Sequence, residues 1–85
     1  MREFASGDII QHFKRETVDQ NSMQYLYEFI GVATHSETRD RVVVYRALYG
    51  DKGLFVRPYE MFMEEVDHDK YPEIRQKYRF EKIRK

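Results

Sequence analysis

Residues 41–58 read RVVVYRALYGDKGLFVRP, and this stretch decides the fold. The β-branched and aromatic run over 41–49 predicts a strand, and a second strand is predicted over 54–57. The turn 50–53 between them has a glycine at each end, which favours a tight hairpin. Proline suits the first position of a helix, so we expect a helical turn to begin at or next to Pro58.

Outward from this hairpin, the pattern predicts three further strands, over 7–13, 25–33 and 78–83. We interpret the polar segments 14–24, 34–40 and 67–77 as loops. A glycine inside a strand often marks a bulge, and Gly31 is the candidate here. One modest helical turn is predicted by the helical spacing of Tyr59, Phe62, Met63 and Val66.

Five strands with one helical turn just before the fifth is the layout of a small SH3-like barrel, and closure removes the exposed edges of a sheet. We therefore expect a mainly β chain that forms a single domain over residues 1–85. A five-stranded oligonucleotide-binding barrel is the main competitor. That fold usually places its helix between the third and fourth strands, where this chain has only the turn 50–53. Val44, in the central strand, is expected to be buried.

The composition excludes several classes of protein. The 85 residues include no cysteine, so disulfides and thiolate metal sites are ruled out. The longest apolar run, 42–45, is far too short to span a membrane, and the N-terminus lacks a signal-peptide core. We therefore expect a cytoplasmic protein with no membrane partner.

The charges balance, with 15 Lys and Arg against 15 Asp and Glu, which removes the simplest argument for nucleic-acid binding. They are nevertheless segregated, because residues 60–69 carry acidic side chains but no Lys or Arg, whereas residues 70–85 carry seven Lys and Arg against two Glu. This separation has two interpretations: two solvated segments that partly neutralise each other, or a basic strip that steers an anionic partner.

Three blocks of sequence carry a family resemblance: THSET at 34–38, VVYRALY at 43–49 and VRPYEMF at 56–62. Together with Arg79-Phe80, they resemble a family of short bacterial proteins catalogued as a domain of unknown function, number sixteen-fifty-three. The resemblance spans about residues 7–83 and implies a small stand-alone bacterial domain without a known activity. Family members usually carry Tyr or His, Lys and Gly where this chain has HFKR at 12–15, and segments 15–23 and 67–77 look longer here.

Two arginines are candidate binding residues. Arg46 lies in an otherwise apolar strand, where a guanidinium needs a partner. Either it forms a salt bridge to Glu28 or Glu60, or it offers a planar fork to a carboxylate or phosphate. The same alternatives apply to Arg57, with Glu60 as the structural partner. If Arg46 and Arg57 form an anion-binding pair, they are expected to converge on one surface, which the hairpin between their strands allows.

The polar loop offers His35, Ser36, Glu37 and Thr38. Adjacent Ser and His residues do not make a catalytic triad, since the nucleophile needs a base within hydrogen-bond reach and a third group to orient that base. The loop either satisfies its own backbone donors or binds the polar edges of a ligand. If the protein is an enzyme, His35 and Glu37 are the pair that would transfer protons.

Other residue types give weaker signals. The spacing of His12, His35, His68, Asp67 and Asp69 matches no metal site. Exposed rings among the tyrosines would form a surface for stacking bases, proline rings or a methylated cation; this group comprises Tyr25, Tyr27, Tyr45, Tyr49 and Tyr59. The lack of tryptophan argues against proline-peptide recognition, and the neutral charge argues against base stacking.

From the sequence we predict a non-catalytic binding module with no catalytic residue, cofactor or metal. The sequence does not name the ligand, and an anionic partner, either RNA or an acidic protein segment, is one candidate. The predicted contact residues are His35, Ser36, Glu37, Thr38, Tyr45, Arg46, Arg57 and Glu60. Two alternatives stay open: a small enzyme or enzyme accessory that uses His35 and Glu37, and a structural domain that docks on another protein.

Overall fold

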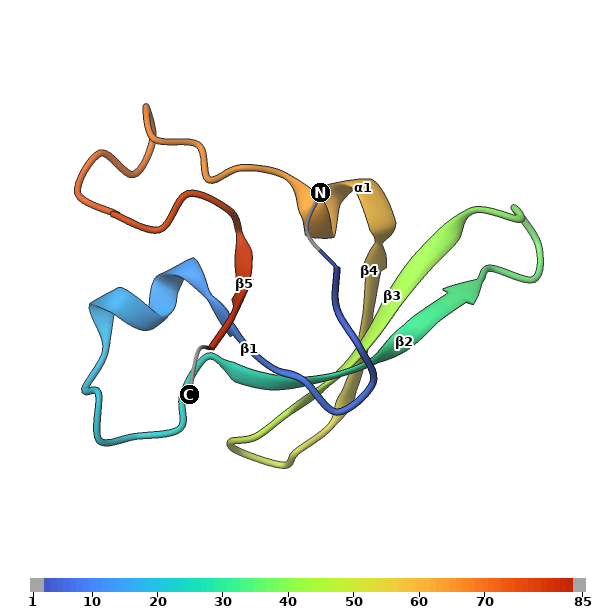
Figure 1. Cartoon of the computed structure of the whole chain (residues 1–85), viewed down its shortest axis with the longest axis horizontal. Coiled ribbons are helices and arrows are strands. Elements are labelled where there is room, and N and C mark those ends of the chain that lie inside the picture. Colours follow the sequence, from blue (N-terminus) through green and yellow to red (C-terminus); the bar gives the residue numbers. More distant parts are fainter. Residues whose placement is uncertain (1–2, 84–85) are drawn as a thin grey trace.

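The computed structural model of the chain describes residues 3–83, and Figure 1 shows its course. In chain order the elements are β1 (Ile9–His12), the 3-10 helix η1 (Phe13–Thr17), β2 (Leu26–Thr34), β3 (Arg41–Ala47), β4 (Leu54–Pro58), α1 (Tyr59–Met63) and β5 (Phe80–Lys82). The five predicted strands and the helical turn after Pro58 are therefore confirmed. The sequence does not predict η1, which begins where the His12 side chain accepts a hydrogen bond from the backbone N–H of Lys14.

All five strands form one antiparallel sheet in the order β4-β3-β2-β1-β5. The prediction of a mainly β chain with a helical turn before the last strand is confirmed, and no helix joins β3 to β4. The expected closure into an SH3-like barrel is wrong, because β4 and β5 are the two edges and do not pair within residues 3–83. Side chains fill the gap instead: Phe62 of α1 stacks on Phe80 of β5, with ring centroids 4.3 Å apart.

One face of the sheet packs the hydrophobic core. On β3, Val43, Tyr45 and Ala47 point to this face, and Val43 is 0% exposed. Side chains from the other strands and from α1 complete the cluster: Ile10, Tyr27, Phe29, Phe62 and Phe80. The expectation that Val44 is buried is wrong, since it lies on the opposite face and is partly exposed. Both faces of β3 carry apolar side chains, so alternation alone did not show which of them meets the core.

Two local irregularities fall where the sequence places them. The register between β2 and β3 shifts between Phe29 and Gly31, which confirms the predicted bulge. In the β3–β4 connection, Gly50 has φ +59°, a conformation that glycine adopts without strain. The second left-handed residue of this turn is Lys52 (φ 57°) rather than Gly53.

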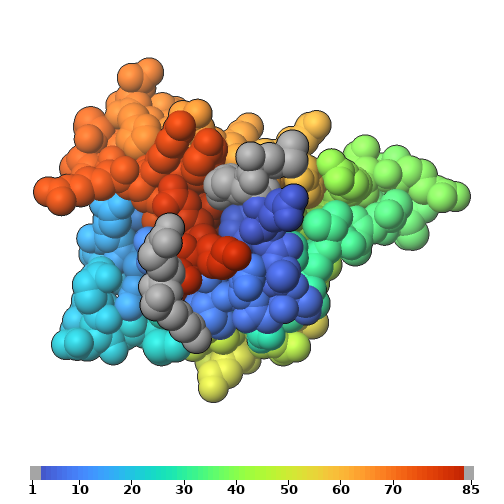
Figure 2. Space-filling model, in the orientation of Figure 1, coloured from blue at the N-terminus to red at the C-terminus, as the bar shows by residue number. Residues whose placement is uncertain are grey.

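The segments 14–24 and 64–79 pack against each other instead of extending freely. Figure 2 shows the orange and red 64–79 segment lying against the blue part of the chain that contains η1. Phe13, Val66 and Ile74 form a second buried cluster, with Tyr71 packed at its edge. The Glu16 carboxylate accepts hydrogen bonds from the backbone N–H groups of residues 75 and 76, the shortest being 2.7 Å. These contacts build one end of the molecule from two segments about sixty residues apart.

Candidate functional site

The loop predicted to bind, residues 34–40, lies at the exposed tip of the β2–β3 hairpin (Figure 1). Nδ1 of His35 accepts hydrogen bonds from the backbone N–H groups of Glu37 and Thr38, at 3.2 and 3.3 Å. The Thr38 hydroxyl accepts one from the N–H of Asp40, and Ser36 is exposed. These side chains therefore stabilise the turn of their own loop, as the simpler interpretation of the sequence predicts.

Arg46 and Arg57 lie on opposite faces of the sheet, so the predicted convergence is wrong. Directly paired residues of an antiparallel sheet point to the same face, and Arg57 pairs with the core residue Val43. Arg46, three positions further along β3, pairs with Glu28 on one side and Leu54 on the other. The ion pairs within residues 3–83 are Arg79–Glu64 and Lys82–Asp8, so neither arginine forms its expected bridge.

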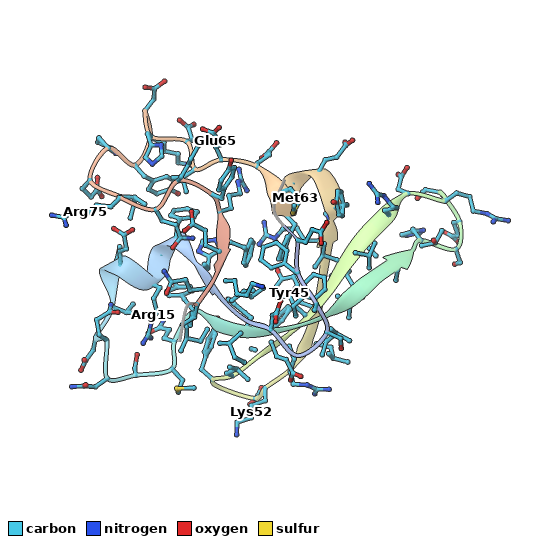
Figure 3. The ribbon with its side chains drawn as sticks, in the orientation of Figure 1. Arg15, Tyr45, Lys52, Met63, Glu65 and Arg75 are labelled. Carbon is cyan, nitrogen blue, oxygen red and sulfur yellow. The ribbon has the colours of Figure 1, made fainter. Side chains whose placement is uncertain are left out.

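Tyr45 and Glu60 also differ from the prediction. Tyr45 is 5% exposed in the core, so its ring offers no surface for stacking. Its hydroxyl accepts a hydrogen bond from Nε of Arg57 at 3.3 Å, and Figure 3 shows Tyr45 among the central elements. Glu60 is exposed and lines a different hollow, beside Tyr59 and Arg41, whose guanidinium lies 4.0 Å from the Tyr59 ring centroid. Of the predicted residues, Arg57 faces a basic pocket.

This pocket has a volume of about 340 Å³ and is lined by residues from four segments of the chain. Its polar residues are His12 of β1, Lys14 of η1, Arg57 of β4, and Asp67, Lys70 and Arg79 of the 64–79 segment. Phe13 and Tyr71 form its aromatic wall, with ring centroids 4.9 Å apart. Four cationic side chains thus line the pocket against one carboxylate.

The burial and the charges around His12 lower its pKa. Burial, followed by the charges of Arg57, Lys14 and Arg79, lowers the pKa of His12 from 6.5 to about 4. The imidazole is therefore neutral at pH 7. Because its Nδ1 accepts the N–H of Lys14 at 3.1 Å, we assign the ring hydrogen to Nε2. With a neutral His12, the pocket lining carries four positive charges and one negative charge.

Polar contacts hold the two arginines of the pocket in place. Arg57 donates from Nε to the Tyr45 hydroxyl and lies over the Phe80 ring, 5.4 Å from its centroid. No carboxylate within residues 3–83 forms an ion pair with Arg57. The backbone of Arg79 is fixed by its N–H, which donates to the Glu64 carbonyl, and by its own carbonyl, which accepts the N–H of Phe13. The partners of the Arg57 guanidinium are therefore a hydroxyl, an aromatic ring and, through Nη1, the Met61 sulfur at 3.8 Å.

Sequence reasoning missed most of this pocket: it includes Lys70 and Arg79 only in the basic strip 70–85, treats His12 only as a possible metal ligand, and proposes neither Lys14 nor Tyr71 as a binding residue. The predicted layout contains one indication of the pocket, because a five-stranded layout of this kind places the first strand beside the last. The observed pairing of His12 with Phe80 is this contact. It brings the HFKR segment at 12–15 next to Arg79.

The fold and the pocket define a class: a small, mainly β domain with an open five-stranded sheet and a basic pocket at one end. The model of a family described as "Protein of unknown function (DUF1653)" matches residues 8–82. The chain therefore belongs to this family, which confirms the resemblance seen in the sequence. No curated protein and no solved structure matches the chain.

Two searches of the described residues complete the survey of sites. No helix within residues 3–83 is both long and apolar enough to cross a membrane. The same part of the chain contains no group of three or more His, Asp or Glu side chains arranged to hold a metal ion.

Proposed function

We propose that this domain is a non-catalytic binding module that holds an anionic group of its partner in the basic pocket. The observation that carries the proposal is the convergence of Lys14, Arg57 and Arg79, from three separate parts of the chain, around the neutral His12. Positive charges that line the same pocket repel one another, and a bound anion offsets this repulsion. The guanidinium of Arg57 suits this role because its planar fork matches a carboxylate or a phosphate.

The alternative of proton transfer by His35 and Glu37 draws no support from the geometry. Both side chains are exposed at the tip of a hairpin, and Nδ1 of His35 is already an acceptor of two backbone hydrogen bonds. A general base works best in a site that excludes water and holds the substrate within hydrogen-bond reach. The loop provides neither condition.

The alternative of a docking domain draws on one observation. Leu54, Phe55 and Val56 of the edge strand β4 are all exposed, at 58%, 48% and 64%. An exposed apolar edge is a common place for a protein contact. The basic pocket supports a more specific proposal, because its charges define the chemistry of what binds there.

The proposal is tested by an NMR chemical-shift titration of the ¹⁵N-labelled domain with sodium phosphate at pH 7, with sodium chloride as the ionic-strength control. We expect saturable shifts at the amides of residues 12–14, 57, 70–71 and 79. Arg57→Gln should weaken binding about tenfold or more, because a charge-assisted hydrogen bond contributes about 1.5 to 3 kcal/mol. Lys14→Gln should act in the same direction, and it serves as a second variant because the Lys14 side chain forms no ion pair within residues 3–83.

The matched control is Lys52→Gln, which removes one positive charge from the β3–β4 turn, at a residue that does not line the pocket (Figure 3). Its effect on phosphate binding should be small. Equal effects of Arg57→Gln and Lys52→Gln, or shifts that never saturate, would mean that phosphate responds only to the overall charge, and the proposal would fail.

A further inference from the structure

The Glu64 carboxylate already forms an ion pair with Arg79, one of the arginines that line the pocket. Glu64, directly after α1, places Oε1 3.3 Å from an Nη of Arg79, and the two side chains are 56% and 30% exposed. The backbone N–H of Arg79 also donates to the Glu64 carbonyl at 2.9 Å. This second bond tethers the two residues, so the Glu64 carboxylate stays close to Arg79 at a high effective concentration.

The bridge is weak enough to be displaced. An exposed ion pair contributes little free energy, since water and salt screen it. Only one oxygen and one nitrogen meet, whereas a guanidinium has five N–H donors. An incoming anion therefore competes with Glu64 for Arg79.

This competition discriminates between anions by charge. A ligand carboxylate offers Arg79 the same single charge and the same oxygen chemistry that Glu64 already provides. A phosphodiester also carries one charge. A phosphate monoester carries almost two charges at neutral pH and has three free oxygens, so it offers the pocket's Lys14, Arg57 and Arg79 more charge and more acceptors than a carboxylate does.

The surroundings of the pocket favour a terminal group over a long polyanion. Residues 64–69 carry four exposed carboxylates: Asp67 lines the pocket, and Glu64, Glu65 and Asp69 are close to it in the sequence. A nucleic-acid strand that passed through the pocket would bring its other phosphates against this acidic segment. A single phosphate at the end of a chain, or a free phosphate compound, avoids that repulsion.

We propose that the pocket selects phosphate monoesters, and that Glu64 is a built-in competitor that keeps singly charged anions off Arg79. This inference rests on the proposed function, because it specifies the ligand of the same pocket. It assigns Glu64 a role in specificity rather than in stability.

The test compares the affinities of methyl phosphate, dimethyl phosphate and acetate by NMR titration at pH 8, where the monoester is dianionic. We expect methyl phosphate to bind the unmodified domain at least about tenfold more tightly than the other two. Glu64→Gln should strengthen the binding of dimethyl phosphate and acetate more than that of methyl phosphate, so that the selectivity falls. Glu65→Gln is the matched control, because it removes the same charge one residue away without touching the Arg79 bridge.

Each outcome decides a separate point. If no anion gives saturable binding, the proposed function itself fails. If dimethyl phosphate or acetate binds as tightly as methyl phosphate, the pocket remains an anion site but the monoester selectivity is refuted. If Glu64→Gln and Glu65→Gln change the affinities equally, the competitor role of Glu64 is refuted.

Parallel titrations with inorganic phosphate and a 5′-phosphorylated dinucleotide distinguish the source of the phosphate group. Tighter binding of the dinucleotide supports a phosphorylated chain end, and equal binding supports a free phosphate compound.

Discussion

Two arginines with opposite roles illustrate how burial decides what a charged residue does. Arg15 is 8% exposed, and its guanidinium donates to the carbonyls of Gln20, Ser22 and Gln24 at 2.6 to 3.0 Å. It closes the 18–25 loop and has no donor directed to a ligand. Arg57 instead has one hydroxyl and one thioether partner and keeps a face toward the pocket. The sequence does not reveal these roles, because Arg15 is buried although it stands between the charged Lys14 and Glu16, whereas Arg57, between Val56 and Pro58, lines the pocket.

Arg15→Met should destabilise the domain by about 1 to 3 kcal/mol, because three carbonyls lose their charged donor. Chemical denaturation followed by circular dichroism measures the change. Arg75→Met is the control, since Arg75 is exposed and the bond from its backbone N–H to Glu16 survives the substitution (Figure 3). A loss of stability no larger than that of Arg75→Met would show that the loop does not depend on the Arg15 guanidinium.

Val43→Ala should cost about 2 to 3 kcal/mol, because it opens a cavity in the fully buried core. Val44→Ala, which removes the same two methyl groups from the partly exposed face, should cost clearly less. Thermal melts of the two variants provide the comparison. Equal losses would mean that the outer face of β3 is as well packed as the core.

At the scale of elements, the strands follow from local signals and the pocket does not. The hairpin 41–58, the Gly31 bulge and the helical turn after Pro58 are each encoded within a few residues. The walls of the pocket depend instead on contacts between segments about sixty residues apart, such as Glu16 with the backbone of 75 and 76. No short-range pattern marks such a contact, so segments 14–24 and 67–77 were interpreted only as polar loops.

Glu16→Ala should release the 72–77 segment from η1, because its carboxylate accepts hydrogen bonds from two backbone N–H groups of that segment. We expect amide hydrogen exchange at residues 75 and 76 to become about tenfold faster, which corresponds to about 1.4 kcal/mol of lost protection. Glu73→Ala removes the same charge from an exposed position in this segment and is the control. Unchanged exchange in Glu16→Ala would indicate that Gln76 and the buried cluster hold the segment without Glu16.

At the scale of the whole molecule, an equal number of acidic and basic residues conceals an uneven charge distribution. The fold concentrates Lys14, Arg57, Lys70 and Arg79 at one pocket and leaves the 64–69 carboxylates beside it. The sequence revealed the separation along the chain but not its arrangement in space. The arrangement needs the pairing of β1 with β5, which joins the two ends of the chain.

The neutral His12 makes stability depend on pH. Its pKa in the fold is about 4, below the ordinary value of 6.5, so the unfolded chain takes up a proton that the folded chain does not between these values. The stability contributed by neutral His12 is therefore complete above pH 6.5 and is lost as the pH falls toward 4. His12→Gln should reduce the decrease in Tm between pH 7 and pH 5, with His35→Gln as the control at the exposed loop. Identical decreases in Tm for His12→Gln and the unmodified domain would contradict a buried, neutral His12.

The pKa of His12, measured by NMR with and without sulfate, tests the anion pocket most directly. Sulfate remains a dianion across the whole titration, so it serves as the probe, with chloride at matched ionic strength as the reference. An anion held among Lys14, Arg57 and Arg79 stabilises the protonated imidazole, and we predict that the pKa of His12 rises by about one unit or more. Arg57→Gln should reduce the rise. A pKa near 4 that is the same in sulfate and in chloride would contradict the assignment of this pocket as an anion site.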